Sequence, residues 1–346
     1  MELVFDIETD DLDATEIHCI VAIDENNKQY TFDIIDDNIL KGLDFLAEAD
    51  KLIGHNIIGF DIPVIKKLHG INLWSKNKII DTLVLSRLFN PVREKGHSLK
   101  VWGSKLGVAK DIPPEDFTVY TKDTLKYCIK DVVLNKALFE YLKKESAGFS
   151  KSSIELEHHV TYILEQQKVN GFKIDIKHTT NLLSELNFKI KEVQDKVHNT
   201  FKPKWVDIKE VKPKLKQNGM LSKSGLTDYE YEDIKLSGNM KPFMRQDLVE
   251  FNLGSRKQIG EYLISFGWKP KKFTPTGQPI VDEGTLKKII HIKEAKLIAD
   301  FLLYQKRIAQ ISSWLDSIKA DDRVHGSVVS TGAITGRMSH RSPNMA

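Results

Sequence analysis

Hydrophobic and polar positions alternate with a period of two over the first 35 residues, which is the pattern of half-buried β-strands. Residues 3–5, 18–23 and 29–32 form three such runs, and the links between them are short. Sequential strands with short links predict a meander. Two later apolar runs, residues 51–54 and 79–83, predict further strands.

Helical periodicity lies between these later strands and dominates after them. Residues 38–49 and 62–67 predict helices, the second with Pro63 in its first turn, where a proline is tolerated. Further helices are expected over residues 98–107, 122–144, 154–169, 176–200, 255–266, 282–290 and 293–318. The pattern predicts an α/β fold with a mixed sheet, followed by a mostly helical region.

A small, polar segment at residues 145–153 separates these two parts. It predicts a domain boundary, with one domain at residues 1–148 and a second at 149–346. Ser153 and Asp175 are expected to cap the helices that follow them, because their side-chain oxygens can accept hydrogen bonds from the first helical amides.

Residues 202–247 differ from the rest of the second part. They are rich in Lys, Gly, Pro and Ser and show little periodicity, so a flexible insertion is expected at about 206–250. Residues 323–346 predict a strand and an irregular segment.

Composition narrows the class of protein. The chain has 346 residues, of which 41% are hydrophobic, enough for a sizeable core in two domains. It has no run of about 18 apolar residues, so a membrane span is not expected. The first residues lack the basic start and apolar stretch of a signal peptide. Only Cys19 and Cys128 are present, which fits a reducing cytoplasm and two ordinary buried thiols.

The net charge of +3 hides an asymmetry between the two parts. Residues 1–150 hold 19 basic and 25 acidic residues, a net charge of −6, whereas residues 151–346 hold 32 and 23, a net charge of +9. The acidic part suits a metal site and the basic part suits a polyanion.

Four carboxylates and one tyrosine are the candidates for chemistry. Asp6 and Glu8 are two residues apart on one predicted strand, so their side chains share a face and repel unless a cation lies between them. Hard divalent ions such as Mg²⁺ or Mn²⁺ are the natural occupants of an all-oxygen site. Asp61 follows His55 and Asn56 as a third carboxylate.

Tyr127 and Asp131 complete the set on the longest predicted helix of the first part. They are four residues apart, so both point the same way. Taken singly, each of these pieces is also common as a strand carboxylate, a first-turn acid or a helix-surface pair. The ordered set indicates a site for two metal ions that hydrolyses phosphodiester bonds.

The set resembles the DEDD proofreading exonucleases, in the subclass with tyrosine in the third motif, and residues 5–12 are similar to the first exonuclease motif of family A DNA polymerases. Residues 80–88 and 96–103 resemble segments of the replicative polymerases of short-tailed podoviruses. Residues 254–259, 266–270 and 305–308 resemble the thumb of these enzymes, and residues 325–328 and 335–339 resemble the segment that enters the palm. The resemblance covers nearly the whole chain except about 206–250.

The resemblance implies a ribonuclease H-like exonuclease domain and a thumb-like helical region. The implied reaction is hydrolysis of the terminal phosphodiester at a single-stranded DNA 3′ end, with release of a nucleoside monophosphate and selectivity for frayed, mismatched ends. Two Mg²⁺ or Mn²⁺ ions would be held by the four acids, one by Asp6, Glu8 and Asp131 and the other nearer Asp6, with Asp61 behind bound water. Tyr127 would orient the attacking water.

The resemblance also implies contacts to DNA. In the first domain, His55 and Asn56 would touch the substrate or support the Asp61 loop, and the remaining candidates are Thr9, Leu12 and Phe60. Leu12 and Phe60 match positions that pack on terminal bases, and simple core residues are an equal alternative for them. Candidate phosphate contacts of the thumb are Ser255, Arg256, Lys257, Lys306 and Arg307. Arg337 and Ser339 match positions on the primer–template minor groove.

The chain departs from the family after residues 343–346, where palm and fingers would follow. We therefore expect no polymerase activity from this polypeptide alone. We expect the N-terminal product of a split polymerase gene, working with a separate palm-and-fingers polypeptide, or a truncated product. The insertion at 206–250 lies at the position where podovirus enzymes bind thioredoxin. Two roles are expected equally for it, thioredoxin binding and contact with DNA through a basic loop. The alternatives for the whole chain are a non-catalytic DNA-binding or assembly subunit and a DEDD-class ribonuclease.

Overall fold

The computed structural model describes residues 1–74, 78–108, 112–289 and 291–345. The chain forms two compact units. The first contains residues 1–174 together with 316–346, and the second contains residues 175–315. Among the described residues, none of the helices combines the length and the apolar character that crossing a bilayer requires.

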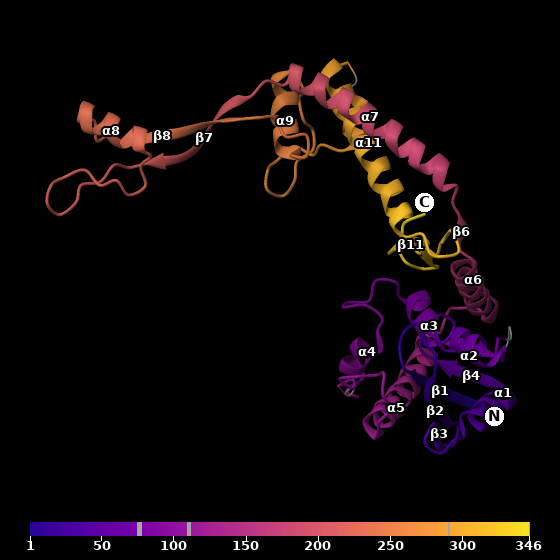
Figure 1. The fold of residues 1–346 in the computed structure, drawn as a ribbon. Helices are drawn as coiled ribbons and strands as arrows, with labels where there is room; N and C mark the ends of the chain where they lie inside the picture. The colour runs from indigo at the N-terminus through magenta and orange to yellow at the C-terminus, as the bar shows by residue number, and fades with distance from the viewer. Residues whose placement is uncertain (75–77, 109–111, 290, 346) are drawn as a thin grey trace. The chain divides into compact units, whose positions relative to one another are not determined.

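A five-stranded mixed sheet forms the centre of the first unit (Figure 1). Its strands are β1 (Glu2–Thr9), β2 (Ile17–Asp24), β3 (Gln29–Asp33), β4 (Lys51–Gly54) and β5 (Ile79–Asp81), in the order β3-β2-β1-β4-β5. β1, β2 and β3 pair antiparallel, and β4 and β5 add in parallel to β1. This confirms the predicted meander and mixed sheet.

Helices cover both faces of this sheet. They are α1 (Ile39–Glu48), α2 (Asp61–His69), α3 (Thr82–Phe89), α4 (Leu99–Leu106), α5 (Lys122–Glu145) and α6 (Lys151–Asn170). Side chains alternate along β1, so Leu3 and Phe5 join the core that contains α1, whereas Val4 joins the core that contains α4 and α5. The even-numbered residues of β1 therefore face α5.

Two sequence predictions were wrong in detail. The strand expected at 79–83 ends at Asp81, because the carboxylate of Asp81 accepts hydrogen bonds from the amides of Leu83 and Val84 and so starts α3. The cap of α6 is Ser150 rather than Ser153. The Ser150 hydroxyl accepts from the Ser153 amide at 3.1 Å, which begins the helix one turn earlier.

The compact units divide the chain at other places than the expected boundary at 148. Helix α6 packs with the sheet, since His158 Nε2 accepts a hydrogen bond from the Asp81 amide at 2.8 Å and Tyr162 stacks on Trp74. The last residues return to the same unit. There, β6 (Phe172–Lys173) pairs with β9 (Arg323–Val324), and β10 (Ser327–Val329) pairs with β11 (Ser339–Arg341).

Helices form the core of the second unit, as the periodicity predicts. They are α7 (Ile176–Thr200), α9 (Arg256–Ser265), α10 (Glu283–Lys288) and α11 (Lys293–Asp316), whose last residue is assigned to the first unit. Asp175 caps α7 as expected, accepting a hydrogen bond from the His178 amide at 2.9 Å. The core gathers Val197, Leu263 and Ile298 from three of these helices.

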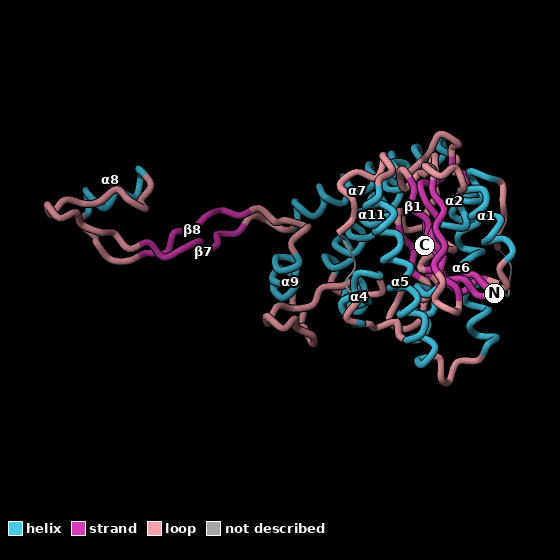
Figure 2. The backbone as a smooth tube through the Cα atoms, turned by 90° about the horizontal axis from the view of Figure 1, so that it is seen from below, coloured by secondary structure: helices cyan, strands magenta, loops and turns pink. Residues whose placement is uncertain are grey.

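The segment expected to be a flexible insertion has regular structure. Strands β7 (Lys204–Val211) and β8 (Phe243–Val249) pair as an antiparallel ribbon that projects from α9 and carries α8 (Asp228–Ser237) beyond its end (Figure 2). The pairing shifts register between Asp207 and Lys209, and this bulge interrupts the alternation that would have revealed β7 in the sequence.

Candidate active site

Asp6 and Glu8 lie on the face of β1 that packs against α5. Their carboxylates and the Cys128 thiol each offer an atom within 4.8 Å of the others. Burial raises the pKa of the Cys128 thiol well above its usual range. Since the thiolate is the form that binds metals, the two carboxylates are the stronger donors of this group.

Asp131 approaches the same place from α5. It is almost fully buried, and it lines one cavity of about 720 Å³ together with Asp6, His55 and Asn56. Tyr127 is one turn earlier on the same helix, half-buried, with its ring edge-on to Phe117 at 6.0 Å. The structure therefore brings Asp131 to the carboxylates of β1, as the sequence predicts.

Asp61 is the first residue of α2 and is buried behind β1. Its Oδ1 accepts a hydrogen bond from the amide of Ile7, the residue between Asp6 and Glu8, at 3.2 Å. Burial raises the pKa of Asp61 to about 7, and the nearby charge of Asp81 acts in the same direction. A buried carboxylate whose ionised form is disfavoured is ready to gain from a nearby cation.

Asp81 is a structural member of this site that sequence reasoning missed. Its carboxylate accepts hydrogen bonds from the amides of Asn56 at 2.9 Å and Ile58 at 3.1 Å, while also capping α3. Burial raises its pKa. An Asp followed by Thr at the end of an apolar run is a signal for a helix cap, but nothing in the sequence signals the contact with the Asn56 loop.

The loop that leads into Asp61 is tightly fitted. Asn56 has a φ of +66°, and a Cβ on Gly59 would lie 2.7 Å from the Asn56 Oδ1. The His55 Nδ1 is 2.9 Å from the Thr82 hydroxyl. His55 and Asn56 thus lie in the loop that leads into Asp61, and both also line the cavity.

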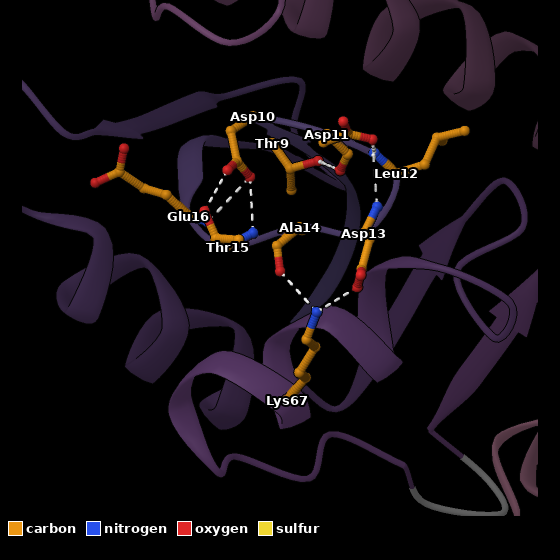
Figure 3. Close-up of polar contacts among 9 residues, drawn as sticks. All are labelled: Thr9, Asp10, Asp11, Leu12, Asp13, Ala14, Thr15, Glu16 and Lys67. Carbon is orange, nitrogen blue, oxygen red and sulfur yellow. Dashed lines mark hydrogen bonds and ion pairs between the residues drawn. The ribbon is translucent and has the colours of Figure 1, made fainter. Parts of the chain in front are cut away.

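The β1–β2 loop carries Leu12 at its tip (Figure 3). Asp10 accepts hydrogen bonds from the amides of Thr15 and Glu16, and Lys67 of α2 reaches Asp13 at 2.6 Å and the Ala14 carbonyl at 2.9 Å. These contacts hold the loop in one shape while the side chain of Leu12 remains 86% exposed.

Thr9 and Phe60 have structural contacts of their own. The Thr9 hydroxyl donates to the Asp11 carbonyl at 2.8 Å within the loop, and Phe60 packs half-buried against the core. Of the two residues expected to pack on bases, Leu12 therefore presents the freely exposed apolar surface.

The five thumb candidates lie in the second unit. The Ser255 hydroxyl caps α9, accepting from the Gln258 amide at 3.3 Å, and Arg256 donates to the Val281 carbonyl at 3.1 Å. Lys257 lies 4.0 Å from Glu261. Lys306 and Arg307 are exposed on α11, where Arg307 donates to Gln310. Ser255 and Arg256 thus have local structural roles.

Arg337 and Ser339 belong to the β10–β11 hairpin of the first unit. Arg337 is exposed, whereas the Ser339 hydroxyl is buried against Gly332, where a Cβ would lie 1.8 Å from it. The same hairpin brings Arg341 to the cavity that contains Asp6. Arg341, with Arg87 and Lys100, is a basic lining of this cavity that sequence reasoning did not identify.

The carboxylates fit the divalent ions that the sequence implies. They supply hard oxygen donors, two of them paired on one strand face and a third in the same cavity. Asp61 is within one hydrogen bond of that strand. Asp6, Glu8 and Asp131 are the residues that would hold the ions, with Asp61 behind them.

Comparison with known proteins places this site in context. Residues 234–346 match the family model described as DNA polymerase family A. The chain is 28% identical to the DNA-directed DNA polymerase of Escherichia phage T7 and to that of Enterobacteria phage T3, over 99% of this chain and 62% of each relative. The chain thus spans less than two thirds of the length of these relatives.

A solved structure shares the fold. It is the POL domain of Pol1 from M. smegmatis in complex with DNA primer-template and dNTP, with a TM-score of 0.65 and 14% identity, over 99% of this chain and 51% of that chain. Sequence and fold therefore agree with the resemblance that the motifs suggested. This chain is related to the family A DNA polymerases.

Proposed function

We propose that the first unit is a metal-dependent 3′–5′ exonuclease that acts on DNA, as the N-terminal portion or a subunit of a family A DNA polymerase. The observation that carries this proposal is the convergence of carboxylates from separate elements. Asp6 of β1 and Asp131 of α5 line one cavity, Glu8 lies beside Asp6 on the same face of β1, and Asp61 of α2 accepts a hydrogen bond from the amide of the residue between them.

The reaction is hydrolysis of a phosphodiester, which develops negative charge on the attacking and leaving oxygens. Divalent ions, when bound, stabilise that charge. The chain's own contribution is to place the carboxylates and to orient the water. Tyr127 is suited to the second task, because α5 points it to the same side as Asp131 and Phe117 holds its ring.

The substrate is proposed to be the 3′ end of a single strand. A base must leave its stack before its phosphate reaches buried carboxylates, and a mismatched end does so at lower cost. Leu12, exposed on a loop fixed by Asp10 and Lys67, supplies an apolar surface for such a base.

Digestion of a 3′-labelled single-stranded DNA oligonucleotide with Mg²⁺ or Mn²⁺ tests the proposal. The wild type should release labelled mononucleotides only with metal, and Asp6→Ala should abolish the release. The matched control is Asp44→Ala, which removes an exposed carboxylate from α1, on the other face of the sheet.

An RNA oligonucleotide of the same sequence tests the ribonuclease alternative. Preferential RNA digestion would favour that class, and DNA binding without any hydrolysis by the folded chain would favour a non-catalytic subunit. Mixing with a palm-and-fingers polypeptide tests the subunit role. The expected results are a stoichiometric complex and a gain in DNA synthesis, and absence of both would refute that role.

A further inference from the structure

The candidate cavity has a basic side that the acid site does not explain. Besides Asp6 and Asp131, it is lined by Arg87 of α3, Lys100 of α4 and Arg341 of β11. Arg87 and Lys100 come from consecutive helices, whereas Arg341 comes from the other end of the chain, so the tertiary fold brings Arg341 to the other two. Three cations in one cavity favour a ligand that carries negative charge along its length.

The two arginines are close enough to act on each other. The pKa of the half-buried Arg87 is lowered by its burial, and the positive charge of Arg341 lowers it further. Asp81 acts in the opposite direction, but its carboxylate already accepts hydrogen bonds from four backbone amides. Two like charges held in one cavity gain from an anion that both can contact.

Arg93, close to these residues in the chain, has a structural role. Arg93 forms a salt bridge with Glu145 and lies over the Trp102 ring at 4.6 Å. Among the described residues, Arg87, Lys100 and Arg341 form no such pair. His97, which also lines the cavity, favours its neutral form, since burial and the nearby Arg87 and Arg93 lower its pKa.

We propose that Arg87, Lys100 and Arg341 form a binding site for the backbone phosphates of the single strand whose end reaches Asp6 and Asp131. The inference deepens the proposed exonuclease function and rests on it for the identity of the strand. Guanidinium groups bind phosphate oxygens through two parallel hydrogen bonds, and a basic groove of this kind holds single strands without reading their sequence.

The position of Arg341 makes strand binding depend on the β10–β11 hairpin. It lies in the segment that matches DNA polymerase family A, in a hairpin whose residues Val329, Thr331 and Gly332 also line the cavity. The strand would therefore be held by one side chain from the polymerase-like segment and two from the sheet domain. Correct docking of this hairpin becomes a condition for tight binding of the strand.

Binding of a fluorescent oligothymidylate of about eight nucleotides, measured by anisotropy in EDTA, tests the proposal without hydrolysis. The full chain is compared with Arg341→Gln, Arg87→Gln and the control Lys41→Gln. Lys41 is exposed on α1, on the other face of the sheet, so its replacement removes one charge away from the cavity. Each arginine variant should raise Kd on the order of tenfold.

The salt dependence distinguishes a phosphate contact from a general decrease in positive charge. For each phosphate that a variant no longer neutralises, the slope of log K against log salt should become shallower by about 0.7. Unchanged affinity and slope in Arg341→Gln, or an equal fall in affinity in Lys41→Gln, would overturn the proposal. Arg341 is exposed, so this variant decides the question even where Arg87→Gln fails to fold.

The two proposals fail separately. A wild type that releases no mononucleotides with Mg²⁺ or Mn²⁺, while Arg341→Gln still binds more weakly in EDTA, would remove the exonuclease and keep the strand-binding site. Metal-dependent hydrolysis with normal binding by both arginine variants would keep the exonuclease and remove the site.

Discussion

The buried carboxyl of Asp61 makes the stability of the metal-free protein depend on pH. Its pKa is raised from 3.8 to about 7. The folded state therefore holds this proton more tightly than the unfolded state, and the stability associated with the proton is present at low pH and is lost as pH rises through 7. The difference between the pKa values of Asp61 in the folded and unfolded states lowers the free energy of unfolding by roughly 4 kcal/mol at pH 8, relative to low pH.

Asp61→Asn removes the ionisable group and so the loss of stability at high pH. It keeps an oxygen that can accept the hydrogen bond from the Ile7 amide. In EDTA, the variant should become more stable relative to the wild type as pH rises, with the gap widening by roughly 4 kcal/mol between pH 4 and pH 8. Hydrogen exchange of the β1 amides in a urea series measures this free energy within the first unit alone.

Added Mg²⁺ should make the gap between Asp61→Asn and the wild type smaller at pH 8. The wild type gains because the ion binds the folded state, whereas the variant lacks one of the carboxylates. Asp44→Asn, which replaces an exposed carboxylate on α1, should behave as the wild type throughout. A gap between Asp61→Asn and wild type that is the same at pH 4 and pH 8 would refute the reasoning, because Asp61 would then ionise normally.

Three further outcomes follow from the site. Tyr127→Phe keeps the packing on Phe117, so kcat on single-stranded DNA should fall by about one to two orders of magnitude with an unchanged melting temperature; an unchanged kcat would contradict its role. Gly59→Ala forces the end of the exposed Asn56 side chain to move aside, and urea unfolding should show a destabilisation of less than about 1 kcal/mol, whereas a larger loss would mean that the loop cannot adapt. Asp81→Ala leaves the Asn56 and Ile58 amides without their acceptor, so the first unit should be destabilised by about 2 kcal/mol or more, and metal-dependent hydrolysis should fall with it; full activity would exclude its supporting role.

Local rules were enough for the sequence predictions where the relevant distance along the chain was short. Alternation along β1 placed Asp6 and Glu8 on one face, and helical spacing placed Tyr127 and Asp131 on one side of α5. Those rules failed at two places where the spacing of apolar positions does not mark the element. The strand at 79–83 was predicted too long because the capping role of Asp81 shortens it, and the β7–β8 ribbon was missed because a bulge breaks its alternation.

Residue type and spacing were enough to predict the mixed sheet, the long helices α5 and α7, and the similarity to family A DNA polymerases. They could not reveal the hydrogen bond from the Ile7 amide to Asp61, the bond from the Asn56 amide to Asp81, or the presence of Arg341 and Arg87 in one cavity. These contacts join residues far apart in the chain. They depend on burial and packing, which fix distances that no local pattern encodes.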